Sequence, residues 1–244
     1  MSLDGASVLV TGGTRGIGLA IAHRLVRDGA GRVVLGYLRN DKAAEETAAE
    51  LRAAGTEVTL VRGNVTSDRV LDEVTALGPL DVLVHNAATG VIRPALETDD
   101  KHWDWTLNAN ARSLLALARA TAPAMEPGSA IVAISSLGAQ RVLANYVLIG
   151  TSKAALESVV RYLGVELAPR GVRVNAVSAS VVDTEALAFF PNKDEMLATV
   201  DRTPAGRLVE PADVASAVSF LCSGDAAMVC GQTLVVDGGF SLTA

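Results

Sequence analysis

The 244-residue sequence has little of what several kinds of protein need. Its two cysteines, Cys222 and Cys230, have no partner histidines at metal-ligand spacing, so we expect neither a disulfide framework nor a bound metal. No stretch approaches the roughly 18 unbroken apolar residues of a membrane span. The first residues also lack the basic and apolar regions of a signal peptide. We therefore expect a cytoplasmic protein with no membrane partner.

A surplus of positive charge is missing as well. The chain has 21 lysines and arginines against 27 acidic residues, a formal net charge of −6 at pH 7. Nucleic-acid binders are more often basic because phosphate contacts dominate their affinity. Half of the residues are hydrophobic and a fifth are charged, which is ample material for a buried core. The composition indicates a globular protein without a nucleic-acid partner.

Short β-branched runs alternate along the chain with longer helical segments, and no linker or repeat interrupts them. Strands of about five residues between helices of ten or more are typical of βα units on a parallel sheet. We therefore expect one α/β domain over residues 1–244, a Rossmann-type doubly wound parallel sheet of about seven strands with helices on both faces. The expected strands are 7–11, 32–37, 57–61, 81–85, 130–135, 172–177 and 233–237, and the expected helices include 17–28, 41–54, 67–77, 100–124, 146–168 and 211–222.

Ligands of such sheets bind at the carboxyl ends of the strands, and the first of these ends carries a glycine-rich turn. The turn reads TGGTRGIG over residues 11–18. Gly12 allows a tight turn, Gly16 and Gly18 let the backbone approach a phosphate and the strand, and the helix that begins near Ile17 directs its N-terminal dipole at the anion. At the start of the first βα unit, this turn predicts dinucleotide binding.

The residues after the second strand indicate which dinucleotide binds. An NAD site usually offers an acid there for the ribose 2′-hydroxyl, but this sequence has Arg39, and Asp41 comes late. A second cation, Arg15, stands in the first turn. Two guanidinium groups suit a 2′-phosphate through charge-assisted hydrogen bonds, so we expect NADPH.

These motifs and several later ones resemble, in order and over the whole length, those of the short-chain dehydrogenase/reductase family. The further motifs are GNV at 63–65, HNAA at 85–88, the asparagine Asn110, the serine Ser136 in AISS, and the closing GQTLVVDGG at 231–239. In VSASVVDT (177–184) the family's Pro-Gly is replaced by Ala179 and Ser180. The resemblance implies cofactor contacts from Gly12, Thr14, Arg15, Gly16, Ile17, Gly18, Arg39, Asn64, Val65, Asn86, Ala87, Ala88, Tyr146, Lys153, Val182 and Thr184.

The stretch ANYVLIGTSKAAL (144–156) departs from the common family pattern. Tyr146 and Lys153 are seven residues apart, and the usual place of the tyrosine, four before the lysine, holds Ile149. This Tyr-x6-Lys spacing resembles the enoyl-acyl-carrier-protein reductase branch. The stretch RPALETDDKHWDWTLNANA and the later TPAGR resemble the NADPH-dependent type III enzymes of that branch most closely.

The shifted tyrosine also has a chemical logic of its own. In ketone reduction, the carbon that receives hydride carries the oxygen that needs a proton. In conjugate reduction of an enoyl thioester, hydride goes to the β-carbon and charge develops on the more distant thioester oxygen. If both residues lie on one helix, moving the donor from 149 to 146 displaces it by about 4.5 Å on roughly one face, with Gly150 leaving space beside it. We therefore expect Tyr146 to serve conjugate reduction and Ile149 to form apolar wall.

The resemblance gives the remaining candidates their roles. Tyr146 would stabilise the enolate oxygen, Lys153 would bind the nicotinamide ribose and lower the proton affinity of the phenol, and Asn110 would orient its helix or hold a water. Ser136 either touches substrate or satisfies backbone at the end of its strand. His85, where the family usually has asparagine, is expected to be a hydrogen-bonded structural residue.

The segment 185–205 is expected to cover the substrate as a lid. Phe189 and Phe190 would either line an acyl chain or pack the lid onto the body. Small residues on the helices 100–124 and 146–168 permit close packing, and the resemblance implies a homotetramer.

We thus expect an NADPH-dependent reductase of an enoyl thioester carried by an acyl carrier protein or by coenzyme A. Two alternatives stay open. One is a carbonyl reductase of the same family, acting on 3-oxoacyl thioesters, polyketides or quinones. The other is a non-catalytic NADP-binding regulatory protein. The sequence leaves the acyl chain length, and the choice between primary and specialised metabolism, undetermined.

Overall fold

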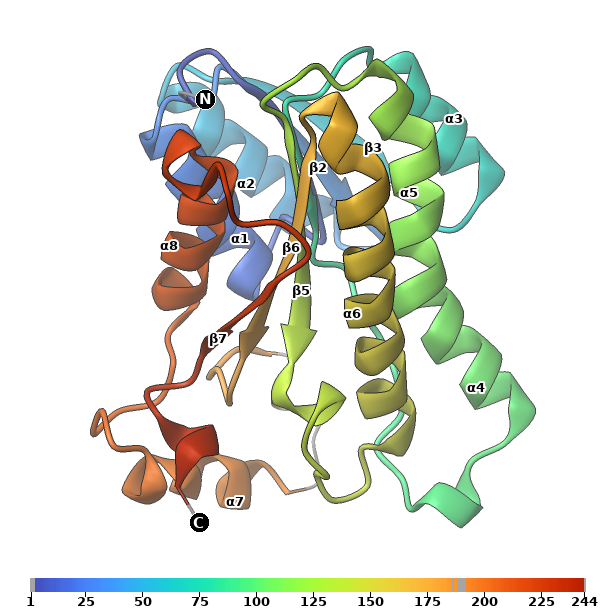
Figure 1. Cartoon of the computed structure of the whole chain (residues 1–244), viewed down its shortest axis with the longest axis vertical. Coiled ribbons are helices and arrows are strands. Elements are labelled where there is room, and N and C mark those ends of the chain that lie inside the picture. The colour runs from blue at the N-terminus through green and yellow to red at the C-terminus, as the bar shows by residue number, and fades with distance from the viewer. Residues whose placement is uncertain (1–2, 186, 188–191, 244) are drawn as a thin grey trace.

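The fold is a seven-stranded, fully parallel sheet with helices on both faces, as predicted (Figure 1). The computed structural model describes residues 3–185, 187 and 192–243. The spatial order of the strands is β3-β2-β1-β4-β5-β6-β7. Their bounds are β1 Ser7–Thr11, β2 Arg32–Tyr37, β3 Glu57–Arg62, β4 Val82–His85, β5 Ala130–Ser136, β6 Arg173–Ala179 and β7 Thr233–Val236. The order reverses between β1 and β4, which is where ligands of doubly wound sheets bind.

Two apolar cores, one on each face, hold the helices against the sheet. The core on one face joins the strands to α1 Gly16–Arg27, α2 Asp41–Ala53 and α8 Pro211–Cys222. The other joins them to α3 Asp68–Ala76, α5 Ser113–Thr121 and α6 Val147–Leu167. The central strands are buried on both faces, which explains their nearly continuous apolar runs.

The strand arrowheads in Figure 1 point to the end of the molecule where α7 Lys193–Leu197, the first turn of α6 and the chain's C-terminus gather. The candidate site residues come from this end. No helix in the described part of the chain is long and apolar enough to cross a membrane.

The expected helix 100–124 is not one regular helix. The chain forms α4 Asp100–Leu107, a π-helical turn Asn108–Arg112, α5, and a 3-10 turn Ala122–Ala124. The π-turn shifts the hydrogen-bond pattern, so that the Ser113 amide donates to the Asn108 carbonyl. The Ser113 hydroxyl donates to the Ala109 carbonyl at 2.6 Å. Such turns carry no glycine or proline signal, and the periodicity of the sequence therefore could not reveal this one.

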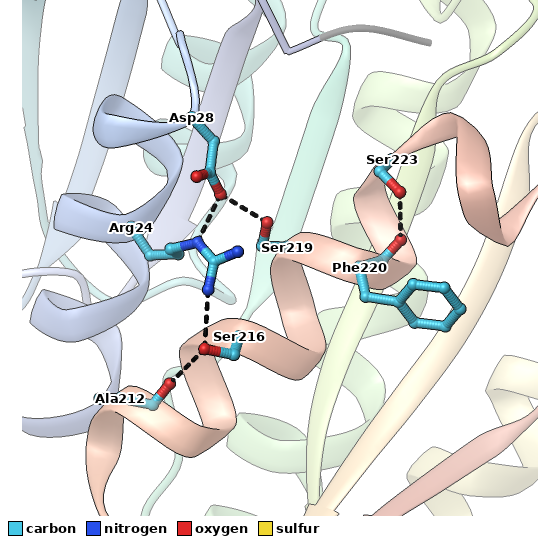
Figure 2. A network of polar contacts seen from close by, with 7 residues as sticks. All are labelled: Arg24, Asp28, Ala212, Ser216, Ser219, Phe220 and Ser223. Atoms are coloured by element: carbon cyan, nitrogen blue, oxygen red, sulfur yellow. Dashed lines mark hydrogen bonds and ion pairs between the residues drawn. The ribbon is translucent and has the colours of Figure 1, made fainter.

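A closed polar network joins α1 to α8 on the face of the sheet opposite α5 and α6 (Figure 2). Arg24 Nε lies 2.6 Å from Asp28 Oδ2, and Arg24 Nη1 donates to the Ser216 hydroxyl at 2.7 Å. The Ser219 hydroxyl donates to the same Asp28 oxygen at 2.5 Å, and Ser216 donates onward to the Ala212 carbonyl at 2.9 Å. This network fixes the helix that follows the glycine-rich turn.

Candidate active site

The turn between β1 and α1 has the shape of a phosphate cradle. Gly12 and Gly16 have φ of +64° and +52°, which glycine adopts without strain. A side chain at Gly18 would collide with the Gly12 carbonyl and would lie 2.6 Å from the Asn86 amide nitrogen. Arg15 is the N-cap of α1, and its side chain makes no capping bond, so the first backbone N–H groups of the helix, including that of Ile17, are available to an anion.

Arg15 and Arg39 are both exposed at this edge of the sheet, and neither makes a side-chain hydrogen bond or ion pair with another described residue. The nearby carboxylate of Asp41 already has two side-chain partners. Tyr37 donates to its carboxylate at 2.9 Å, and Arg62 lies 3.3 Å from the other oxygen. Sequence reasoning missed this arrangement, which joins the ends of β2 and β3 and leaves the two free guanidinium groups for a phosphate.

The end of β4 is tied to the glycine-rich turn. Asn86 donates through its side-chain amide to the carbonyls of Thr11 and Gly12 at 3.0 and 3.1 Å. The backbone N–H groups of Asn86 and Ala87 both donate to the Thr11 hydroxyl at 3.0 Å. These bonds place Ala88 and the following loop beside the first turn, as the HNAA motif predicts.

Asn110 joins three elements around the site. Its side chain accepts from the Thr89 N–H and donates to the Thr89 carbonyl, both at 2.8 Å, and it also donates to the Ser152 hydroxyl at 2.8 Å. The residue is fully buried in the π-turn. Asn110 therefore holds the loop after β4 against α6, and its role in the reaction stays a prediction.

Lys153 is a buried cation whose side chain, within the described part of the chain, donates a hydrogen bond to a backbone carbonyl. Its Nζ donates to the Ile134 carbonyl of β5 at 2.7 Å. Burial lowers the pKa of Lys153 to about 8, while the nearby Glu157 acts in the opposite direction. Glu157 is itself buried and accepts from Ser135 and Gln140 at 2.7 and 3.1 Å, a contact that the sequence analysis missed.

Tyr146 approaches the site from the position just before α6. Its hydroxyl lies 3.5 Å from the Ser136 hydroxyl at the end of β5. Burial raises the pKa of Tyr146, and the hydrogen bond to Ser136 opposes that shift. The structure thus brings Tyr146, Ser136 and Lys153 to the same end of β5.

The assumption that Tyr146 and Lys153 belong to one helix is wrong. The helix α6 begins at Val147, and Tyr146 is its N-cap with φ −107° and ψ 13°. The preceding Asn145 has φ +59°, the only positive φ of a non-glycine residue in the described chain. Its left-handed backbone ends the incoming loop and starts the helix, a signal that the sequence pattern does not contain.

Ile149, at the usual position of the family's tyrosine, is buried. An added Cβ on Gly90 would meet the Ile149 side chain, with Cδ1 at 2.9 Å, and would lie 3.2 Å from Thr106 Cγ2. The loop after β4 therefore packs directly on Ile149. Its role as apolar wall toward an acyl chain stays a prediction.

His85 is fully buried at the end of β4, where the family usually has asparagine. Its Nε2 lies 2.6 Å from the Ser113 hydroxyl. Because that hydroxyl donates to the Ala109 carbonyl, Nε2 is the donor and Nδ1 is left as an acceptor without a partner among the described residues. Burial, and next the charge of Lys153, lower the pKa of His85 to about 3. His85 is thus a neutral ring that anchors the π-turn, in keeping with a structural role.

The remaining predicted contacts come from loops after β3 and β6. Asn64 accepts from Thr66 and shapes the loop after β3, where Val65 packs on the core. Val182 forms an isolated bridge with Val209, and Thr184 lies 3.5 Å from the place of a Cβ on Gly16. Thr14 is buried in the first turn. Ser180 has no positive φ, so the absence of the family's glycine requires no special backbone there.

The expected lid 185–205 is described only in part. It contains α7 and the 3-10 turn Ala198–Arg202. Arg202 lies over the Phe240 ring at 5.5 Å, and the Ala205 N–H donates to the Gly238 carbonyl at 3.1 Å. The base of this segment therefore rests on the C-terminal loop. Phe189 and Phe190 lie outside the described residues.

Known sequences are similar to this chain over nearly its whole length. Residues 12–241 match the family model described as Enoyl-(Acyl carrier protein) reductase. The 1-cyclohexenylcarbonyl-CoA reductase of Streptomyces collinus is 38% identical over 244 residues, covering 97% of this chain and 87% of the relative. The L-xylulose reductase of Mesocricetus auratus is 33% identical over 248 residues, covering 100% of this chain and 99% of the relative.

Solved structures are also similar over nearly the whole chain. A Bacillus cereus enoyl-acyl carrier protein reductase with NADP+ and indole naphthyridinone has a TM-score of 0.93 at 28% identity, covering 100% of this chain and 99% of its own. A Burkholderia cenocepacia short chain dehydrogenase in complex with NADP has a TM-score of 0.90 at 31% identity, covering 99% and 100%. The cofactors bound in these similar structures agree with the predicted one.

Proposed function

This chain belongs to the short-chain dehydrogenase/reductase family, and we propose that it reduces the 2,3 double bond of an enoyl thioester with NADPH. Membership of the family makes it an NAD(P)-dependent oxidoreductase. One observation carries the finer proposal. The phenol that meets Ser136 comes from position 146, while position 149 holds a buried isoleucine.

The residues of the first turn fit NADPH. The positive φ values of Gly12 and Gly16, and the missing space for a side chain at Gly18, make a cradle for the pyrophosphate. Arg15 and Arg39, which have no partner among the described residues, suit the 2′-phosphate, and Asp41, which already binds Tyr37 and Arg62, is a poor acceptor for a ribose hydroxyl. When bound, the nicotinamide supplies a hydride, which conjugate reduction directs to the β-carbon of the substrate.

The protein's own groups then handle the charge that develops on the thioester oxygen. The Tyr146 phenol donates a hydrogen bond to this oxygen, a type of stabilisation typically worth several kcal/mol. The Lys153 ammonium, held by the Ile134 carbonyl, binds the ribose hydroxyls and lowers the proton affinity of the phenol. Asn110 keeps the loop after β4 in place, and Ser136 hydrogen-bonds the phenol or the substrate.

The similarity to the Streptomyces collinus enzyme supports this substrate class. Its name denotes a coenzyme A thioester whose carbonyl is attached to a ring double bond, which is a conjugated enoyl thioester. We propose a substrate carried by coenzyme A or by an acyl carrier protein, in fatty-acid synthesis or a related pathway of the cytoplasm. We also propose that residues 185–205 form the substrate lid.

We further propose a homotetramer. Large apolar side chains are exposed along α4–α6 and along the edge strand β7 with its neighbour α8: Trp103, Trp105, Leu115, Tyr162, Val165, Phe220, Leu234 and Val235. An unprotected edge strand with apolar side chains favours association with a second chain. Light scattering after size-exclusion chromatography measures the mass directly, and a monomer would refute this assembly.

The function is tested by following NADPH oxidation with crotonyl-coenzyme A and with acetoacetyl-coenzyme A in parallel. We expect turnover on the enoyl substrate and a loss of at least about 100-fold in the Tyr146→Phe variant. Tyr162→Phe is the matched control, because Tyr162 lies on α6, the helix that follows Tyr146, but is 73% exposed. It should keep full activity.

The similarity to L-xylulose reductase favours a second candidate, carbonyl reduction. Turnover of acetoacetyl-coenzyme A alone would support that candidate and contradict ours. NADPH binding without turnover of either substrate would instead support a non-catalytic role.

A further inference from the structure

Two glycines around Tyr146 occupy positions where the backbone does not require glycine. Gly138 lies in the 3-10 turn Leu137–Ala139 after β5, and Gly150 lies in the first turn of α6. Neither has a positive φ. Alanine is favoured over glycine inside a helix by about 0.5–1 kcal/mol, so the backbone alone gives no reason for Gly150.

The space beside Gly138 is taken by the tyrosine ring. A Cβ on Gly138 would lie 2.5 Å from Tyr146 Cε1 and 2.6 Å from Cδ1. Carbon atoms in ordinary van der Waals contact are about 3.5–4.0 Å apart, so an alanine there would displace the ring. The ring therefore lies directly on the Cα of Gly138.

Gly150 brings α6 close enough to make this contact. A Cβ on Gly150 would lie 2.7 Å from the Gly138 carbonyl oxygen and 3.7 Å from Tyr146 Cδ1. The Gly150 N–H donates to the Tyr146 carbonyl at 2.7 Å, which makes a hydrogen bond at the start of the helix. Without a side chain at 150, the backbone at the start of α6 packs on the backbone of the turn after β5, and the Tyr146 hydroxyl lies 3.5 Å from the Ser136 hydroxyl.

We infer that Gly138 and Gly150 form a seat without side chains that holds the Tyr146 ring, and that they are positioning residues for the shifted tyrosine. This inference rests on the proposed role of Tyr146. A tyrosine at position 149 would start instead from the place of Ile149, whose side chain packs on Gly90. The seat is therefore matched to a phenol at 146, and it determines where the hydrogen-bond donor stands relative to Lys153.

The test is a double-mutant cycle between Gly138→Ala and Tyr146→Phe, measured as kcat with crotonyl-coenzyme A. A misplacement of the donor of about 1 Å can cost about 100-fold, so we expect Gly138→Ala to lower kcat by about that factor. The same substitution in the Tyr146→Phe background should cost less than about 3-fold, because the ring is still displaced but the hydroxyl that acts as donor is gone. The Kd for NADPH, from the cofactor's fluorescence, should change by less than about 3-fold when Gly138→Ala is introduced, with or without the phenol.

Gly164→Ala is the matched control for packing. Gly164 is also on α6, and a Cβ there would lie 3.0 Å from Gly231, far along the helix from Tyr146. This variant should lower Tm while leaving kcat unchanged. Gly150→Ala as a single variant, in contrast, should lower kcat, as Gly138→Ala does.

The outcomes separate the inference from the proposed function. If Tyr146→Phe abolishes turnover and Gly138→Ala does not reduce it, the seat is refuted and the function stands. If Gly138→Ala costs the same factor with and without the phenol, it acts through the fold, and the seat is again refuted. If Tyr146→Phe itself keeps full turnover, both the proposed function and the seat are wrong.

Discussion

Two polar clusters of the molecule differ in how completely their charges are compensated. In the α1–α8 cluster of Figure 2, Arg24 meets a carboxylate and a hydroxyl, and Asp28 meets a guanidinium and a hydroxyl. In the active-site cluster, Lys153 meets a carbonyl, and His85 keeps one acceptor atom without a partner in the described chain. The first cluster is also about a quarter exposed, while the second is buried.

The difference indicates what each cluster is for. A closed network gains its modest stability from pairs that already exist in the folded chain. A buried cation with spare donors costs stability, because burial disfavours its charge, and its remaining N–H groups are left to bind something else. Perturbed pKa values in such a cluster are typical of functional sites.

The largest expected effect comes from removing the uncompensated charge. Lys153→Met should lower kcat/KM with crotonyl-coenzyme A by at least about 100-fold and weaken NADPH binding, because the ammonium no longer reaches the ribose or the phenol. Lys101→Met, an exposed lysine of α4, is the control and should behave as wild type. A Lys153→Met variant with near-normal turnover would place the chemistry elsewhere.

The same lysine predicts how pH acts on activity and on stability. Because the folded pKa of Lys153 is about 8, against an ordinary value of 10.5, kcat/KM should fall as pH rises through about 8. Below pH 8 the lysine is charged in both the folded and the unfolded chain, and the burial cost is fully present. Between 8 and 10.5 the folded chain releases its proton first, so this residue makes the free energy of unfolding rise with pH.

Urea unfolding measures this contribution when wild type and Lys153→Met are compared at about pH 7 and about pH 10. The free energy of unfolding of wild type, relative to that of Lys153→Met, should be higher at about pH 10 than at about pH 7. A difference that is independent of pH would show that Lys153 is not buried as a costly cation.

A smaller effect is expected from Asn110, which is buried but fully paired. Asn110→Ala removes three hydrogen bonds and leaves the Thr89 backbone groups without their partners, so the free energy of unfolding should fall by about 2–3 kcal/mol. Activity should fall as well, because the loop after β4 is released from α6. Thermal unfolding and kcat on the same preparation check both expectations. An unchanged Tm would contradict the conclusion that Asn110 holds the loop after β4 against α6.

The smallest effect should come from the closed cluster. Arg24→Met should lower the free energy of unfolding by no more than about 1 kcal/mol, because the pair is partly exposed and isolated pairs of this kind contribute little. It should leave kcat and its pH dependence unchanged. If the pH dependence of kcat shifts in Arg24→Met, the α1–α8 cluster also acts on the reaction, and the comparison of the two clusters is wrong.

The sequence predicted the elements of the sheet well because their signal is local. The strands 7–11 and 32–37 have the predicted bounds, and glycine positions marked the first turn. The start of α6 at Val147 lies within one residue of the expected start at 146. The break of 100–124 by a π-turn could not be predicted, because it involves side chains that meet only in the folded chain. Ser113, for example, bonds His85 from 28 residues away.

The site was predicted through motifs, and its supporting contacts were not. The structure brings the motif residues Tyr146, Lys153 and Ser136 together, and Asn110 reaches α6 through Ser152. Gly138, and Glu157 with its hydroxyl and amide donors, carry no motif of their own. Their importance follows from distances, which a single sequence does not contain.

The most direct test of the central claim is the fate of hydride from deuterium-labelled NADPH given to the enzyme with crotonyl-coenzyme A. The product is analysed by NMR and mass spectrometry, with acetoacetyl-coenzyme A as the competing substrate in the same tube. We expect butyryl-coenzyme A with the cofactor's deuterium on the β-carbon and no labelled hydroxy product. Labelled 3-hydroxybutyryl-coenzyme A, with crotonyl-coenzyme A untouched, would contradict it.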